Sequence, residues 1–283
     1  MLKAFANAKI NLLLDILGRE ENGYHTVNNI MQTVSLQDTV TLSCKGEGIR
    51  VSYDDGYPVT DKDICLNAAK KYEKVSGRKI NADIFINKVI PTAAGLGGNS
   101  SAAAAVLTLL NEKYAYLTHN QLLEIAATLG ADVPFFLIGG TALCEHYGEI
   151  ITHIPPMPKL YVVIAKIGDK DSTAEMYKKL DQIGTSKAAA LDKILSAIKS
   201  REAKNVFPLM QNVFEKAASK ESLKLIQIIK DCGAEKAMLS GSGPAVFGMF
   251  YDEQGADGCC RALCDMGISA YLCETTDKGI KLE

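Results

Sequence analysis

The sequence predicts an α+β protein of two domains, on the strength of three observations. The chain has 283 residues, 47% of them hydrophobic, which exceeds the usual single domain of about 100–200 residues. Short alternating apolar and polar runs, typical of strands, are interspersed with segments that carry helix-capping residues. Three prolines, Pro155, Pro156 and Pro158, fall within four positions, which disfavours a helix or a central strand there. We therefore predict domains of residues 1–155 and 156–283.

The first domain is expected to combine strands with capped helices. One helix should start at Asp61 or Asp63 and end before Gly77, because a carboxylate suits the first turn and glycine the position after the last. A second should run from Thr118 to Gly130 for the same reason. Alternation and β-branched residues predict strands over residues 9–16, 39–43 and 84–90.

The second domain is expected to be another mixed unit of strands and helices. Its predicted elements are a strand at 160–166, helices from Ser172 to about Lys230, a strand at 245–251, a helix at 253–266 and a strand at 269–273.

The charge balance excludes some classes of partner. Lys and Arg total 31 and Asp and Glu total 33, so a net charge of −2 gives no long-range attraction to nucleic acid or to an anionic membrane. An anionic ligand must then be held by local groups. The chain shows no secretory signal and no apolar run of about 20 residues, so we expect a cytoplasmic protein.

The eight cysteines are scattered along the chain and include no Cys-x-x-Cys pair. The nearest approach to a metal cluster is Cys259, Cys260 and Cys264. Because cysteine is often buried as a free thiol, we expect free thiols here and predict no metal site built from protein ligands.

A glycine-rich loop precedes an alanine-rich helix predicted over residues 101–113. Glycines let the backbone approach a phosphate closely, and the first amides of the helix point unpaired toward such a ligand. The loop lacks the Gly-Lys-Ser of a P-loop and the spacing of a dinucleotide fingerprint. On composition alone, a flexible turn capped by Asn99 or Ser100 is the alternative. The candidate phosphate-binding residues are Pro91, Thr92, Ala93, Ala94, Gly95, Leu96, Gly97, Gly98, Asn99, Ser100 and Ser101.

A second glycine turn contains Gly241, Ser242 and Gly243, just before the strand at 245–251. Such a turn is more often structural than ligand-binding.

Two charged residues stand in apolar surroundings, where a charge usually needs a partner. Lys9 lies within Ala-Lys-Ile-Asn-Leu, and Asp132 lies within Gly-Ala-Asp-Val-Pro. Lys9 could instead protect an edge strand, and Asp132 could simply cap a helix ahead of Pro134.

Proline, Gly-Leu-Gly and paired serines opening an alanine helix together resemble the ATP-binding loop of the GHMP kinases, named for galactokinase, homoserine kinase, mevalonate kinase and phosphomevalonate kinase. The resemblance runs from Ala6 to about Phe247. It implies an ATP-dependent small-molecule kinase with an N-terminal domain like that of ribosomal protein S5, a ferredoxin-like C-terminal domain, and the site in the cleft between them.

The same resemblance implies roles for individual residues. The segments around Lys9 and Asp132 are similar to those with the catalytic Lys and Asp, so Asp132 would accept the proton of the substrate hydroxyl while Lys9 neutralises developing charge. The turn Gly241–Gly243 would lie near the phosphates. Mg²⁺ is implied with ATP, held chiefly by the phosphates, with Ser101 as a protein contact.

Further matches indicate the acceptor. Within Gly-Tyr-His, Tyr24 and His25 correspond to residues that contact a cytosine ring, and Tyr177 to a second aromatic on that ring, although a core role suits Tyr177 equally. Asn11 is two residues beyond Lys9, on the same face of a strand, and would lie near the acceptor end. The implied reaction is transfer to the 2-hydroxyl of a cytidine diphosphate conjugate of methylerythritol, a step of non-mevalonate isoprenoid synthesis.

The chain departs from the family pattern at several positions. Asn99 stands where Gly or Ser is usual, Ala93 and Ala94 replace frequent glycines, Asp171 replaces an apolar residue, and Asp63 falls where an Asn near the adenine is common. These departures bear on nucleotide affinity and leave the reaction class unchanged.

Two rival functions differ in what they require. Another GHMP kinase, acting on mevalonate, homoserine or a sugar, would keep the glycine loop but not Ala-Lys-Ile-Asn-Leu with Gly-Tyr-His. A non-catalytic ligand sensor on the same fold would be expected to have lost Lys9 or Asp132, and both are present.

Overall fold

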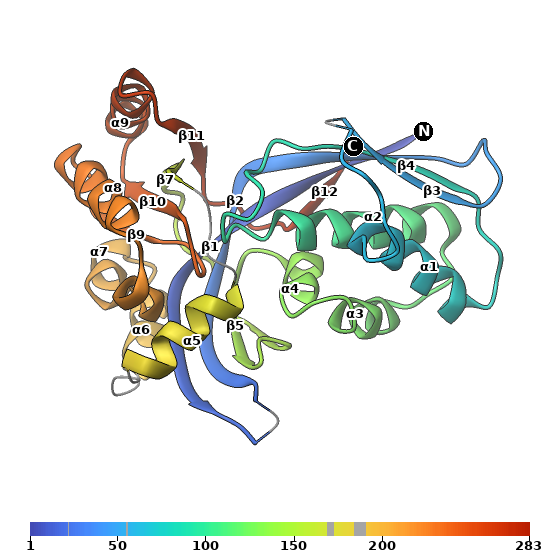
Figure 1. The fold of residues 1–283 in the computed structure, drawn as a ribbon, viewed down its shortest axis with the longest axis horizontal. Helices are drawn as coiled ribbons and strands as arrows, with labels where there is room; N and C mark the ends of the chain where they lie inside the picture. The colour runs from blue at the N-terminus through green and yellow to red at the C-terminus, as the bar shows by residue number, and fades with distance from the viewer. Residues whose placement is uncertain (22, 55, 169–172, 184–190) are drawn as a thin grey trace.

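The computed structural model describes residues 1–21, 23–54, 56–168, 173–183 and 191–283, and within these the chain forms two sheets (Figure 1). The larger sheet has eight strands, with β12-β1-β2-β4-β3 as its main path. Off this path, β5 pairs with β2, β6 pairs with β5, and β8 pairs with β1. Its strands are β1 (Leu2–Arg19), β2 (His25–Ser43), β3 (Ile49–Tyr53), β4 (Ala82–Asn87), β5 (Thr141–His146), β6 (Ile150–His153), β8 (Gln211–Asn212) and β12 (Ile280–Leu282).

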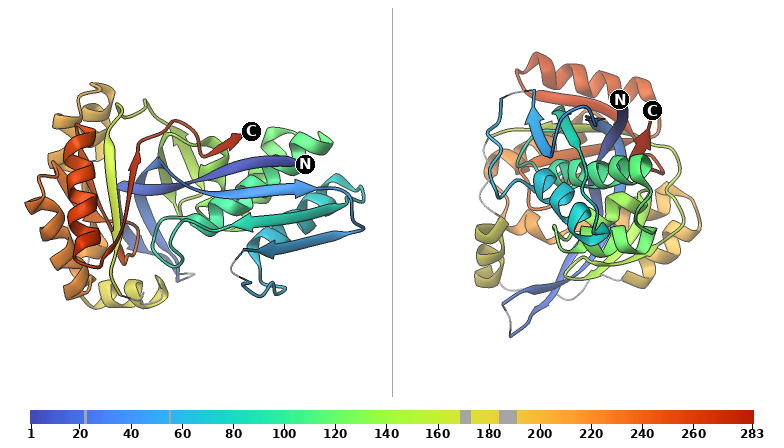
Figure 2. Two further views of the ribbon diagram at one scale, coloured as in Figure 1. Left: turned by 90° about the horizontal axis from the view of Figure 1, so that it is seen from above. Right: turned by 90° about the vertical axis from the view of Figure 1, so that its right-hand side faces the viewer.

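Strands β1 and β2 are longer than the alternation predicts. They pair antiparallel along almost their whole length, with register shifts at Asn7/Ala8, Asn11/Leu13 and Ile16/Gly18. Most of β1 is buried without alternation, because the strand is covered on both faces. The pair runs from the larger sheet into the C-terminal layer, so it connects the two halves of the molecule (Figure 2).

Four helices cover one face of the larger sheet: α1 (Ile64–Ser76), α2 (Gly98–Tyr114), α3 (His119–Ala127) and α4 (Val133–Ile138) (Figure 1). The capping predictions are confirmed at Asp63 and Gly77 of α1 and at Thr118 of α3, where Thr118 and Gln121 form a capping box. Helix α3 ends before the predicted Gly130, since the chain turns at Thr128 toward α4.

The C-terminal part forms a four-stranded antiparallel sheet in the order β11-β7-β10-β9. Numbered along the chain, that order is 4-1-3-2, and α8 and α9 supply the two crossovers, which is the ferredoxin-like arrangement predicted. Its strands are β7 (Tyr161–Lys166), β9 (Lys236–Leu239), β10 (Ala245–Phe250) and β11 (Ser269–Glu274). Its helices are α5 (Thr173–Ile183), α6 (Leu191–Lys199), α7 (Ala203–Val206), η1 (Phe207–Leu209), η2 (Val213–Ala217), α8 (Lys220–Asp231) and α9 (Glu253–Asp265).

The domain boundary at residues 155 and 156 stays a prediction. It lies between β6 and β7, where the chain passes from the larger sheet to the smaller one. Two short strands, β8 and β12, return from the C-terminal half to pair with β1.

All eight cysteines are free thiols, as predicted. Within the described ranges, no helix has the length and apolar character needed to cross a membrane.

Candidate active site

One cavity of about 520 Å³ collects most of the predicted site residues. It lies where the glycine loop, β1, β2, the start of α4 and the turn before β10 come together. Four predicted residues, Ser101, Gly243, Tyr24 and His25, do not line it. The predicted residues that line it are Lys9, Asn11, Pro91, Thr92, Ala93, Ala94, Gly95, Leu96, Gly97, Gly98, Asn99, Ser100, Asp132, Tyr177, Gly241 and Ser242.

Two positions in the glycine loop require glycine. Gly95 has φ +80°, and a Cβ there would lie 2.1 Å from the carbonyl oxygen of Ser240. Gly97 has φ +73° at the start of α2, and its Cβ would lie 2.6 Å from the ring of Phe136. The loop therefore packs tightly against Ser240 and Phe136, and α2 presents the amides of its first turn toward the cavity.

The second glycine turn is bonded directly to the first. Ser240 donates from its hydroxyl to the carbonyl of Gly95 (3.1 Å), and the N–H of Ala245 donates to the carbonyl of Ala94 (3.2 Å). Asn212 donates to the carbonyl of Gly241 (2.8 Å) and fixes the turn from the other side. Asn212 carried no signal in the sequence, since a lone Asn between helices is ordinary.

Lys9 is buried in the middle of the site, with 4% of its surface exposed. Its N–H donates to the carbonyl of Leu96 (3.0 Å), and its ammonium donates to Oδ1 of Asn11 (2.7 Å). Burial lowers the pKa of Lys9, an effect that the negative charge of Asp132 partly opposes. The backbone contact with Leu96 means that Lys9 does not protect an exposed edge: the glycine loop covers β1 at this point.

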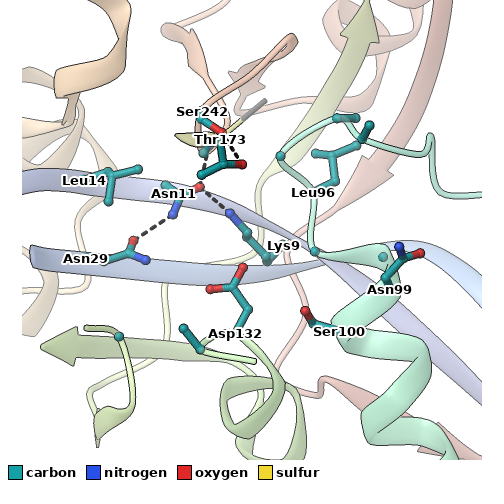
Figure 3. Close-up of a pocket in the computed structure, with 18 of the residues that line it drawn as sticks. Lys9, Asn11, Leu14, Asn29, Leu96, Asn99, Ser100, Asp132, Thr173 and Ser242 are labelled. Carbon is teal, nitrogen blue, oxygen red and sulfur yellow. Dashed lines mark hydrogen bonds between the residues drawn. The ribbon is translucent and has the colours of Figure 1, made fainter. Parts of the chain in front are cut away.

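Asp132 stands at the N-cap position of α4, yet its side chain caps nothing. Figure 3 shows its carboxylate directed into the cavity, toward the Lys9 side chain. In the described part of the chain, Asp132 forms no ion pair within 4.0 Å, so Lys9 and Asp132 face each other across a gap. A carboxylate that capped the helix would accept hydrogen bonds from its backbone N–H groups, whereas the carboxylate of Asp132 is available to a ligand.

The predicted base-binding residues are arranged in two pairs. His25 stacks on Tyr177 with ring centroids 4.6 Å apart and bonds to Asp181 through Nε2 (2.7 Å). Burial, helped by the charge of Asp132, raises the pKa of Tyr177 to about 12, which keeps its hydroxyl neutral. Tyr24 is 66% exposed, and its ring lies against that of Tyr147 (5.4 Å).

Tyr147 is a residue that sequence reasoning missed. It comes from the turn between β5 and β6, lines the cavity, and donates its hydroxyl to Glu20 on the β1–β2 hairpin (2.7 Å). A tyrosine beside a glycine in a turn has no distinctive pattern, so only the fold places it here.

A second cation, Lys88, also lines the cavity and was not predicted. It forms a buried ion pair with Asp38, whose carboxylate also accepts from the N–H groups of Val89 (2.7 Å) and Ile90 (2.8 Å). The pair fixes the entry to the glycine loop and places the ammonium of Lys88 beside Gly98.

Two of the departures from the family pattern, Asp63 and Asn99, can be placed in the structure. Asp63 caps α1 by accepting from the N–H of Leu66 (2.8 Å) and from the hydroxyl of Tyr53 (2.7 Å). Its carboxylate is therefore bonded within the protein. Asn99 lies exposed in the first turn of α2 at the cavity, while Asp171 lies outside the described residues.

The arrangement of cation, carboxylate and phosphate loop in one cavity is that of a small-molecule kinase, and comparison with known proteins agrees. Residues 63–140 match the family described as "GHMP kinases N terminal domain", and residues 190–269 match the family described as "GHMP kinases C terminal". The fold and the site thus define a GHMP kinase.

Comparison with curated relatives shows which kind of GHMP kinase the chain resembles. The 4-diphosphocytidyl-2-C-methyl-D-erythritol kinase of Alkaliphilus metalliredigens is 40% identical over 87% of this chain and 86% of that protein. The enzyme of the same name from Lachnospira eligens is 39% identical over 95% and 96%. A crystal structure of 4-(cytidine 5'-diphospho)-2C-methyl-D-erythritol kinase has a TM-score of 0.84 and 29% identity over 96% of this chain and 98% of that one. The chain belongs to the 4-diphosphocytidyl-2-C-methyl-D-erythritol kinase family.

A homoserine kinase from Cytophaga hutchinsonii, with a TM-score of 0.74 and 20% identity over 100% of this chain and 97% of that chain, shares the fold.

Proposed function

We propose that this protein transfers the γ-phosphoryl group of ATP to the 2-hydroxyl of 4-diphosphocytidyl-2-C-methyl-D-erythritol, in the non-mevalonate synthesis of isoprenoid precursors. The observation that supports this most strongly is that one cavity joins the glycine loop with Lys9 and Asp132. The names of relatives that match nearly the whole chain support the identity of the acceptor.

The placement of each group supports the role proposed for it. The glycine loop and the first amides of α2 hold the phosphates of ATP, and the turn containing Gly241 and Ser242 approaches them from the C-terminal sheet. Asp132, with its carboxylate unused by α4, orients the acceptor hydroxyl and takes its proton. Lys9, buried and cationic, stabilises the charge that develops on the transferred group. Phosphoryl transfer needs positioning and charge more than covalent help, and this site provides both.

The acceptor is proposed to extend from Asp132 toward the His25–Tyr177 stack, which suits a flat heteroaromatic base. Because Tyr177 lines the cavity while His25 stacks behind it, His25 would act at the edge of the base or through Tyr177. Tyr24 would need to move, or to act through Tyr147, to reach the ligand.

Mg²⁺ is proposed to accompany ATP and to offset the charge of its phosphates. Among the residues described, no group of three or more His, Cys, Asp or Glu could hold a metal ion, so the phosphates themselves would supply most ligands. The hydroxyl of Ser101 is proposed for a minor role: it is buried in the first turn of α2 and, in the described ranges, has no hydrogen-bond partner.

The proposal is tested by measuring ADP release with a panel of alcohols that includes mevalonate, homoserine and the cytidine diphosphate conjugate. Only the last should give rapid turnover. Asp132→Asn should lower kcat at least about 100-fold, as expected for loss of a general base. Near-normal turnover by this variant would disprove the role of Asp132, and preference for another alcohol would disprove the acceptor.

A further inference from the structure

We infer that Asn29 is a specificity-determining residue that binds the acceptor and also positions Asn11; this rests on the proposed function. Asn29 lies on β2, lines the cavity and is 7% exposed. No motif in the sequence pointed to it.

The hydrogen bonds fix how the amide of Asn11 is oriented. One atom of this amide accepts hydrogen bonds from the ammonium of Lys9 (2.7 Å) and from the backbone N–H of Gly241 (2.7 Å). Both partners are donors only, so this atom must be the carbonyl oxygen. The amide nitrogen of Asn11 therefore points the other way and must find an acceptor.

Asn29 supplies that acceptor. The nitrogen of Asn11 lies 2.7 Å from Asn29, so the facing atom of Asn29 is its oxygen (Figure 3). Reversing Asn11 would set its NH₂ group against an ammonium and an N–H, which are also donors. Asn29 thus holds Asn11 in the one orientation that serves both Lys9 and the second glycine turn.

Because the oxygen of Asn29 faces Asn11, its NH₂ group is left to bind a ligand. Figure 3 shows this group turned away from Asn11, and it makes no hydrogen bond to the described side chains and backbone. Among the described residues, the NH₂ group of Asn29 is not one of the buried polar atoms that lack a partner, so it meets the solvent of the cavity that it lines. An oxygen of a bound ligand can take the place of that water and accept from the NH₂ group.

The position along β2 indicates which part of the ligand this is. His25, Val27 and Asn29 alternate onto one face of the strand, and His25 to Asn29 spans about 13 Å at the usual rise per residue. The His25–Tyr177 stack marks the base end, whereas Asn29 adjoins Asn11 and Lys9. Asn29 therefore donates to an oxygen of the polyol end, beside the hydroxyl that accepts phosphate.

Two substitutions separate the two roles. Asn29→Asp keeps an oxygen for Asn11 but loses the donor, so the KM of the acceptor should rise about tenfold, the usual effect of one lost hydrogen bond, while the KM of ATP stays within about twofold. Asn29→Leu loses both functions and should also lower kcat, because Lys9 is no longer held by an oriented Asn11.

Asn28→Leu is the matched control. Asn28 is the adjacent residue on β2, points to the opposite face and does not line the cavity, so both KM values should stay at the wild-type level. Thermal melting of each variant without ligand reports any structural damage separately.

A double variant tests direct contact. If Asn29 binds the acceptor itself, adding Asn29→Asp to Asn11→Ala should raise the acceptor KM further. The inference is overturned if the added change has no effect, or if Asn29→Asp alters only the melting temperature. Either result would leave the proposed function intact, since the wild-type preference for the cytidine diphosphate conjugate is measured independently.

Discussion

Replacing Gly95 by alanine should separate the two glycine turns. The Cβ of alanine would lie 2.1 Å from the carbonyl oxygen of Ser240, and this is a backbone atom that cannot swing aside. The loop must then move away from the turn that it contacts. The stability of the fold should depend on that contact, and so should the affinity for ATP if the glycine loop binds its phosphates as proposed.

The magnitude follows from what is lost. Alanine in a left-handed conformation costs about 1–2 kcal/mol relative to glycine. The bonds from Ser240 to Gly95 and from Ala245 to Ala94 would break at about 1 kcal/mol each. The free energy of unfolding should fall by about 3–4 kcal/mol, which shifts the urea midpoint by about 1 M at a typical slope.

Gly77→Ala is the matched control for Gly95→Ala. Gly77 also has a positive φ, of +65°, but nothing lies within 4 Å of its would-be Cβ. Its substitution should cost about 1 kcal/mol and leave the KM of ATP unchanged. Urea unfolding and ATP saturation curves should therefore separate the two variants clearly. Equal losses of stability, or an unchanged KM of ATP in Gly95→Ala, would refute the argument that the two turns act as one unit.

Three further changes probe charges and the acceptor wall. Lys9→Met should abolish turnover but raise the urea midpoint at pH 8, because the buried ammonium destabilises the folded chain. Burial lowers the pKa of Lys9, so between that pKa and the pKa of an exposed lysine the unfolded chain binds more protons than the folded one. The stability of the wild type should therefore rise with pH in this range, and that of the variant should not. Asp38→Asn should cost about 3 kcal/mol in urea unfolding and raise the KM of ATP, since Lys88 loses its buried partner. Tyr147→Phe should raise the acceptor KM about threefold, whereas Glu20→Gln, which retains an acceptor for the hydroxyl, should not.

Much of the fold was predictable because local signals agreed with it. Caps and glycines set the ends of α1 and the start of α3, and three of the four strands of the C-terminal sheet, β7, β10 and β11, lie where they were predicted. The short strand β9 was not predicted. The lengths of β1 and β2 were not predictable. Their bulges interrupt the alternation, and burial on both faces removes the polar positions by which strand ends are recognised.

The site was predictable where residues belong to a motif that is continuous in sequence. The glycine loop, Lys9 and Asp132 stand in such motifs, and they line one cavity. Asn29 and Tyr147 could not be found in this way, because an asparagine in a strand and a tyrosine in a turn are ordinary until pairing across β2 brings them to the cavity.

The burial of Lys9 explains why the site is built as a network. An ammonium removed from water is destabilising unless its donors are satisfied, and Asp132 is too far to form an ion pair with it. The neutral oxygen of Asn11 satisfies part of that need without cancelling the charge. In the proposed mechanism, the positive charge is thereby preserved for the migrating phosphoryl group, and the carboxylate of Asp132 for the incoming hydroxyl. A direct Lys9–Asp132 pair would be more stable in the free protein, but it would have to be broken before either group could act.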